Sequence, residues 1–215
     1  PYLHKALDFP GDPMLSFMHW THRLFPYGPT WLVLTVPLSF LGLQFFLPTF
    51  FLFKLLMSIS FLGTVFFIGK IIRRVLPGNE VFGIAFFALN PLVVIESLVS
   101  SHNDIVMMFL TILCLYLLVS KKYIWSIILL GLSVGIKFAT LILIPIFLLI
   151  YYFEKQNKKL NWEILFSAAT VAMIIPIILA SYRTNFQPWY LLNILPLAAL
   201  VAKNIIFLFL ALLYL

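Results

Sequence analysis

From residue 24 to residue 53 the chain carries no charged side chain, and further uncharged apolar runs follow almost to its last residue. A helix needs about 20 apolar residues to cross the ~30 Å hydrocarbon core of a bilayer, and several of these runs approach that length. Apolar residues make up 63% of the chain and charged residues 10%. One soluble core could not cover so much apolar surface. We therefore predict an all-α fold, a polytopic transmembrane helical bundle.

We expect about eight membrane segments after an outer loop with interfacial helices at residues 1–29, so that residues 30–215 form the transmembrane domain. The run 30–47 contains Pro37 and is followed by Pro48, which predicts a tilted or half-inserted helix. Because the chain starts at Pro1 and its last run covers half a span, we expect an internal piece, N- and C-terminally truncated. The expected spans are 48–72, 81–99, 105–119, 123–136, 138–153, 164–181, 189–202 and 205–215.

The basic residues lie in the short linkers between these spans. The formal charge of +7 is therefore explained by membrane topology, and we expect no nucleic-acid partner. Cys114 is the single cysteine and lies in an apolar run, which excludes disulfides and Cys-ligated metals. If successive linkers lie on alternate sides of the membrane, one face carries only Lys5, Arg23, Lys137 and Arg183. The side on which Lys54 lies is undecided. The opposite face, cytoplasmic by the positive-inside rule, collects Lys70, Arg73, Arg74, Lys121, Lys122, Lys155, Lys158, Lys159 and Lys203.

The outer face collects a different set of side chains. A protein that only crosses the membrane has no need to sort its histidines and most of its carboxylates onto one face, so we expect any chemistry to lie outside. This set comprises His4, His19, His22, His102, Asp8, Asp12, Glu96 and Asp104.

The stretch NPLVVIESLVSSHNDIVMMF places Glu96 in the last turn of one span and begins the next span directly after His102, Asn103 and Asp104. In one interpretation Ser101, Asn103 or Asp104 caps the new helix. In the other, His102 and Asp104 line a pocket with Glu96 one turn away, since a carboxylate inside an apolar span needs a partner or water.

Lys137 follows Tyr123 by 14 residues, about 21 Å of helix, which is short of a full crossing. We therefore expect it below the membrane surface, in a water-lined recess or paired with an acid, where it suits a phosphate group. The alternative is a lysine that snorkels at a hairpin turn. Gly131 and Gly135 would let another helix approach closely.

Two further stretches carry candidate residues. In RTNFQPWYLLNILP, Arg183, Gln187, Trp189 and Tyr190 form either an interfacial anchor or a site for a sugar or lipid headgroup. In the opening loop, Asp8 and Asp12 could act as a base or hold a divalent cation. His19 and His22 would share a face if helical, although a solvated interfacial segment is the commoner outcome.

Taken in order, four stretches resemble the GT-C type membrane glycosyltransferases, especially the mannosyltransferase-like members that use polyprenyl-phosphate sugars. They are PY with FPYGPTW, NPLVVIESLVSSHND, LLGLSVGIKFATLILIPIFLL and FQPWYLLNILPL. The resemblance implies transfer of a mannose-like hexose from a polyprenyl-phosphate donor to a lipid, glycan or protein acceptor at the outer face. The positions matching the family's motifs are His102, Asn103, Asp104, Lys137 and Gln187 to Tyr190.

In the family the base is an acid in the first outer loop, just after the first helix. Here Asp8 and Asp12 are the only acids in that loop, and neither stands in a matching motif, so an acid upstream of Pro1 is the alternative base. No cofactor is certain, and a divalent cation, Mg²⁺ or Mn²⁺, stays an open alternative; no metal ligands are assigned. The implied location is multi-pass in a prokaryotic plasma membrane, among membrane lipid, with the active site outward.

Two other classes compete with an enzyme. A transporter or flippase for a lipid-linked or anionic solute would use Glu96, Asp104 and Lys137 as midplane charges. The gathering of polar residues at one face and the lack of an inverted repeat disfavour it. A scaffold subunit would not explain why the polar residues gather on the outer face. Since no Gly-rich phosphate loop or HExxH motif occurs, ATP-driven pumps and zinc hydrolases are disfavoured.

Overall fold

The computed structural model describes residues 2–12, 14–18, 20–43 and 45–203, and this part of the chain is helical without a β-strand. The predicted all-α class is therefore confirmed at this level. His19 and the expected segment 205–215 lie outside the described residues.

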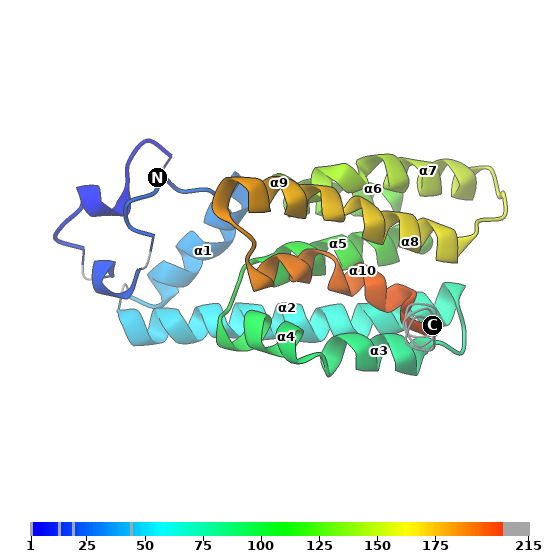
Figure 1. Cartoon of the computed structure of the whole chain (residues 1–215), viewed down its shortest axis with the longest axis horizontal. Coiled ribbons are helices and arrows are strands. Elements are labelled where there is room, and N and C mark those ends of the chain that lie inside the picture. The colour runs from blue at the N-terminus through cyan, green and yellow to red at the C-terminus, as the bar shows by residue number, and fades with distance from the viewer. Residues whose placement is uncertain (1, 13, 19, 44, 204–215) are drawn as a thin grey trace.

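Helices line the two long sides of the molecule, with two more between them (Figure 1). One side is formed by α2 (Phe46–Val75), α3 (Glu80–Ala88) and α4 (Pro91–Val94). The other side is formed by α6 (Tyr123–Val134), α7 (Ile144–Lys155), α8 (Trp162–Ala172) and α9 (Ile174–Thr184). Between them lie α5 (Asp104–Val119), which contacts α2 and α6, and α10 (Leu195–Leu200), which contacts α3 and α8.

The core forms around α5, because this helix is apolar on nearly all its faces and packs on both sides. Met107, Met108 and Ile112 are fully buried there, and Ile68 and Ile72 of α2 meet the same core. A helix that is apolar all round is expected to be enclosed by others.

Helix α1 (Pro29–Leu41) ends earlier than the expected run 30–47, so that boundary is wrong. Proline is well suited to the first turn, and Pro29 and Pro48 both lie in the first turn of a helix, α1 and α2. The chain turns between the two helices at Leu43, whose φ is 52°. Pro37 lies inside α1 without ending it.

The expected span 81–99 is bent in the structure. It is broken into α3, α4 and a π-helical turn, η3 (Ile95–Val99), with a bend of 55° between its two halves. The side chain of Asn90 accepts hydrogen bonds from the backbone N–H groups of Leu92 and Val93, at 3.0 and 3.4 Å. Pro91 follows at the first helical position, so this Asn-Pro pair starts a new helix.

Among the described residues, three helical stretches are long and apolar enough to cross a membrane, and a fourth if the bent pair counts as one span. They are Phe46–Val75, Phe138–Lys155 and Trp162–Thr184, the second joining the 3₁₀ turn η4 (Phe138–Leu143) to α7. Several shorter apolar helices, including α5 and α6, lie beside them. The chain is therefore a membrane protein by its helices, and the count of about eight stays a prediction.

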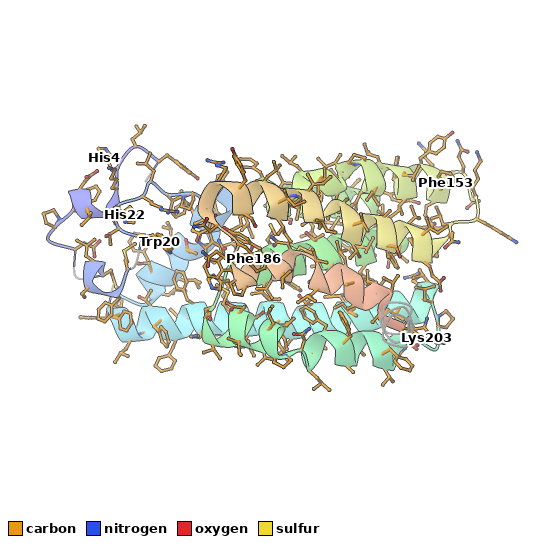
Figure 2. The ribbon with its side chains drawn as sticks, viewed as in Figure 1. His4, Trp20, His22, Phe153, Phe186 and Lys203 are labelled. Carbon is orange, nitrogen blue, oxygen red and sulfur yellow. The ribbon has the colours of Figure 1, made fainter. Side chains whose placement is uncertain are left out.

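The connections gather at the two ends of the bundle. One end carries the first segment, residues 2–28, with the short 3₁₀ turns η1 (Ala6–Asp8) and η2 (Leu15–Phe17), and Figure 2 shows His4 and His22 there. The opposite end, which we call the basic end, carries the turns 76–79, 120–122 and 156–161, with Phe153 and Lys203 beside them (Figure 2). The predicted separation of histidines from most lysines thus matches two opposite ends of the bundle.

Candidate functional site

A buried ion pair joins the turn after α6 to the start of α5. The ammonium Nζ of Lys137 donates to Oδ2 of Asp104 over 2.5 Å. The side chain of Asp104 is 1% exposed and that of Lys137 is 22% exposed. Lys137 is thus paired with an acid below the surface, as one of the two expectations for it required. A pair so deeply shielded from water is only weakly screened by salt.

The capping interpretation of 101–104 does not fit the structure. Asn103 is the residue that precedes α5, but its side chain makes no capping hydrogen bond, and its buried Nδ2 has no partner among the described residues. Asp104 is the first residue of α5, where a carboxylate is favoured by the helix dipole. Its hydrogen-bond partner is nevertheless Lys137, 33 residues further along the chain.

Glu96 and His102 form a second contact beside this pair. Ser101 has a φ of 61°, which turns the chain back so that the N–H of His102 donates to the carbonyl oxygen of Glu96 over 2.9 Å. This turn brings Nε2 of His102 to 3.2 Å from Oε2 of Glu96. Burial lowers the pKa of His102 below its ordinary value, against the opposing effects of Asp104 and Glu96. The imidazole is therefore neutral near pH 7.

Aromatic side chains from the C-terminal part of the chain cover His102. The indole of Trp189 stacks on the imidazole, with ring centroids 4.1 Å apart and an interplanar angle of 16°. Trp189 lies in the 3₁₀ turn η5 (Pro188–Asn193), next to Tyr190, whose hydroxyl shares a hydrogen bond of 2.6 Å with Oγ1 of Thr184. The structure thus brings the FQPWY stretch onto the 102–104 turn, a contact that the sequence alone did not predict.

Tyr27 is a member of the site that sequence reasoning missed. Its ring centroid lies 5.4 Å from Nζ of Lys137, so the ammonium contacts both the Tyr27 ring and the carboxylate of Asp104. Burial raises the pKa of the Tyr27 phenol, which Lys137 opposes and Asp104 reinforces. The signal was present in FPYGPTW, where an aromatic residue precedes a Gly-Pro helix start.

The first segment is fixed to the 135–137 turn by backbone hydrogen bonds. Gly28 N–H donates to the Ile136 carbonyl and Thr30 N–H donates to the Gly135 carbonyl, each over 2.9 Å. A Cβ atom at Gly28 would overlap the backbone carbonyl of Gly135, and a Cβ atom at Gly135 would overlap the side chain of Thr30. The expected close approach at Gly135 is therefore observed, although it comes from the start of α1. The expectation for Gly131 is wrong, because nothing lies within 4 Å of the position that a Cβ atom would take there.

Buried hydroxyl groups continue the contact between α5 and α6 below the ion pair. Oγ of Ser133 lies 2.8 Å from Oγ1 of Thr111 and 3.1 Å from Oγ1 of Thr140, and donates to the carbonyl of Met107.

Sequence reasoning also left Lys54 undecided. Its ammonium donates to the carbonyls of Leu98 and Val99 at the end of η3, which are acceptors with no helical partner.

Besides Asn103, four predicted residues remain outside this cluster. The carboxylates of Asp8 and Asp12 accept local hydrogen bonds from the backbone N–H groups of Lys5 and Met14, each at 2.8 Å. Together with Ser39 and neighbouring residues they line a separate cavity of about 620 Å³ at the same end of the bundle. Arg183 is exposed in the last turn of α9, and Gln187 is half-buried directly before η5.

We call the assembled residues the Lys137 cluster; they combine one ammonium, two carboxylates, a neutral imidazole and aromatic faces. Buried Oδ1 of Asp104 and Oδ1 of Asn193 have no hydrogen-bond partner among the described residues, so both can accept from a ligand hydroxyl. In that same part of the chain, no group of three His, Cys, Asp or Glu side chains could hold a metal ion. The members of the cluster are Tyr27, Glu96, His102, Asp104, Lys137, Trp189 and Tyr190.

Comparison with known proteins supplies a family. The sequence model of the alpha-(1->6)-mannopyranosyltransferase N-terminal domain matches residues 1–153. No curated protein and no solved structure matches the chain. The matched part contains Tyr27, Glu96, the 102–104 turn and Lys137. Because the match covers more than half of the 215 residues, the chain belongs to the alpha-(1->6)-mannopyranosyltransferase family and is a glycosyltransferase.

Proposed function

We propose that the chain transfers a mannose-like hexose from a polyprenyl-phosphate donor to a glycan, lipid or protein acceptor at the outer face of the membrane. The observation that carries this proposal is the buried Lys137–Asp104 pair with His102 and Trp189 stacked beside it. An enzyme that transfers mannose from the proposed phosphate donor needs a cation for the phosphate and polar and aromatic groups for the sugar. This one cluster supplies all three.

Lys137 takes the donor phosphate in this proposal. The Lys137 ammonium has three N–H groups. One of them donates to Asp104, which holds the ammonium in place and leaves the other two for phosphate oxygens. As the bond between C1 of the sugar and the phosphate oxygen breaks, its electron pair leaves with the phosphate. The ammonium stabilises the negative charge that develops there. Arg183, exposed at the same end, is a second cation for the phosphate.

The sugar lies against the remaining polar groups. The unpaired oxygen of Asp104, the amide of Asn103, Glu96 and Gln187 hydrogen-bond its hydroxyls, and Trp189 and Tyr190 contact its C–H edges. The acceptor hydroxyl attacks C1 and loses its proton to a carboxylate base, for which we propose Asp8 or Asp12. Their cavity of about 620 Å³ has the size usual for a small-molecule site and supports this assignment.

The proposed bundle is of the GT-C type, with about eight membrane segments, in a prokaryotic plasma membrane. The Lys137 cluster faces outward, because most lysines and arginines gather at the basic end and such residues favour the cytoplasmic side. The domain organisation stays as expected from the sequence, with an outer loop at residues 1–29 and a membrane domain at 30–215.

The test is transfer of labelled mannose from polyprenyl-phosphate mannose to a short mannoside acceptor by the protein in proteoliposomes. Asp104→Asn should lower the transfer rate roughly 100-fold or more, because it releases Lys137 and removes an acceptor for the sugar. Membrane insertion should be unchanged. The matched control is Glu154→Gln at the basic end, where the carboxylate lies 3.9 Å from Lys121 and is expected to have no effect. Wild-type turnover by Asp104→Asn would remove Asp104 from the site, and movement of the lipid-linked sugar across the membrane without transfer would favour a transporter.

A further inference from the structure

A second hollow lies at the basic end, opposite the Lys137 cluster. Its volume is about 390 Å³, and it lies between the end of α2 and the start of α8. Its lining combines apolar side chains with charged and amide side chains. The lining residues are Val75, Leu76, Lys159, Leu160, Asn161, Trp162 and Glu163.

The position of this hollow along the membrane normal follows from the helices that border it. Two of the three stretches able to cross a membrane have an end there, since Phe46–Val75 finishes at the hollow and Trp162–Thr184 begins at it. The ends of spanning helices lie at the level of the lipid headgroups. Trp162 is half-buried, and tryptophan is enriched at that level. The hollow therefore opens where phospholipid headgroups are found.

Two opposite charges line the hollow without neutralising each other. In the described part of the chain, neither Lys159 nor Glu163 has an ion-pair partner. Other charged groups at this end are engaged, as Lys121 is with Glu154 and Lys158 is with the rings of Tyr152 and Phe153.

An amide group completes the lining. Oδ1 of Asn161 accepts the N–H of Ile164 over 3.1 Å, which leaves the amide NH₂ of Asn161 to donate to a ligand. The lining thus offers one cation, one anion and one neutral donor together with apolar side chains.

We infer that this hollow binds the headgroup of a zwitterionic phospholipid with a primary amine, of the phosphatidylethanolamine class. Its phosphate meets the ammonium of Lys159 and the amide of Asn161, and its amine meets the carboxylate of Glu163. The first methylenes of its acyl chains lie on Val75, Leu76 and Trp162. An anionic headgroup without an amine leaves Glu163 unpaired beside a second negative charge, which disfavours it. A choline headgroup cannot donate a hydrogen bond to that carboxylate. This lipid site is independent of the proposed sugar transfer.

The experiment is native mass spectrometry of the detergent-solubilised full chain, with phosphatidylethanolamine, phosphatidylcholine or phosphatidylglycerol added at equal concentration. The wild type should retain phosphatidylethanolamine best. Lys159→Gln should weaken retention of all three roughly tenfold, because each loses a charge-assisted contact to its phosphate. Glu163→Gln should weaken retention of phosphatidylethanolamine, raise retention of phosphatidylglycerol because the repulsion of its negative charge is removed, and leave phosphatidylcholine unchanged. The matched control is Lys122→Gln, an exposed lysine of the same end that does not line the hollow.

Three results would overturn the inference. One is equal retention by the wild type and both hollow variants, and another is a wild-type preference for phosphatidylglycerol. The third is displacement of the lipid by inorganic phosphate at a similar concentration, which would make the hollow a site for free phosphate.

Discussion

The two ends of the bundle use their charges in opposite ways. In the Lys137 cluster an ammonium and a carboxylate lie 2.5 Å apart with side-chain exposures of 22% and 1%. At the basic end, Arg73 lies 3.7 Å from Glu80 and Lys121 lies 3.9 Å from Glu154, and the two cations are 71% and 57% exposed. The end with more charges thus holds the looser contacts. For this chain the burial of a charge, rather than the number of charges, indicates the site.

Exposed and buried ion pairs differ in how much they contribute to the free energy of unfolding. Exposed ion pairs stabilise a protein by about 0–1 kcal/mol, whereas removing one partner of a buried pair costs about 3–5 kcal/mol, because a charge is left without compensation. The basic end is accounted for by membrane topology. The Lys137 cluster requires another explanation, and substrate binding supplies it.

The largest expected effect comes from removing Lys137. Lys137→Met should lower the free energy of unfolding by about 3–5 kcal/mol, because Asp104 is then buried and unpaired. Adding Asp104→Asn should restore most of that loss without restoring transfer. Unfolding in mixed micelles measures the first effect, and the transfer assay measures the second.

The control for that experiment belongs to the basic end. Arg73→Gln should change the free energy of unfolding by about 1 kcal/mol or less. Equal losses from Lys137→Met and Arg73→Gln would remove the distinction between the two ends.

A smaller effect is expected where the first segment docks on the cluster. Gly135→Ala should lower the free energy of unfolding by about 1–3 kcal/mol, because the added methyl group overlaps the Thr30 side chain. Gly131→Ala, one turn earlier with open space around it, should be neutral or stabilising by up to about 1 kcal/mol. A stability loss of the same size in both variants would show that the docking contact has no special role.

Tyr27 should act on the donor through Lys137. Tyr27→Leu removes the aromatic ring 5.4 Å from the ammonium and should weaken donor affinity roughly 2- to 30-fold, the range of a cation–π contact. Tyr27→Phe keeps the ring and should bind the donor like the wild type. Wild-type donor affinity in both variants would contradict this role. A loss of donor affinity in both variants would assign the effect to the hydroxyl instead of the ring.

The smallest expected effect is the pH dependence contributed by His102. Burial lowers its pKa below the ordinary value of 6.5, so the unfolded chain binds a proton at a higher pH than the folded chain does. The stability contribution is therefore complete above about pH 6.5 and declines as the pH falls below that value. His102→Gln should flatten the fall in melting temperature between pH 6.5 and pH 5, and His22→Gln, at an exposed position, should leave it unchanged. An unaltered fall in the His102 variant would contradict the assignment.

The sequence alone predicted the helical membrane class and the two ends, because apolar runs and linker charges are local signals. It also predicted that Lys137 lies below the membrane surface, in a water-lined recess or paired with an acid, since the segment before it is too short for a full crossing. The structure shows the second of these, the pair with Asp104. It could not identify the docking of Tyr27, because the hydrogen bonds from Gly28 to Ile136 and from Thr30 to Gly135 join residues more than 100 positions apart. The break at Asn90 was missed although Asn-Pro signals it, since the flanking residues are uniformly apolar. The catalytic roles of Asp8 and Asp12 stay predictions.

The most direct test of the account is the affinity of the protein for a sugar-free polyprenyl phosphate in nanodiscs, compared between two lysine variants. Lys137→Met should lower this affinity roughly tenfold or more, because a charge-assisted contact to the phosphate is lost. Lys121→Met, at the basic end, should bind the carrier like the wild type. Unchanged affinity in Lys137→Met, or an equal loss in both variants, would contradict the placement of the donor phosphate at the Lys137 cluster.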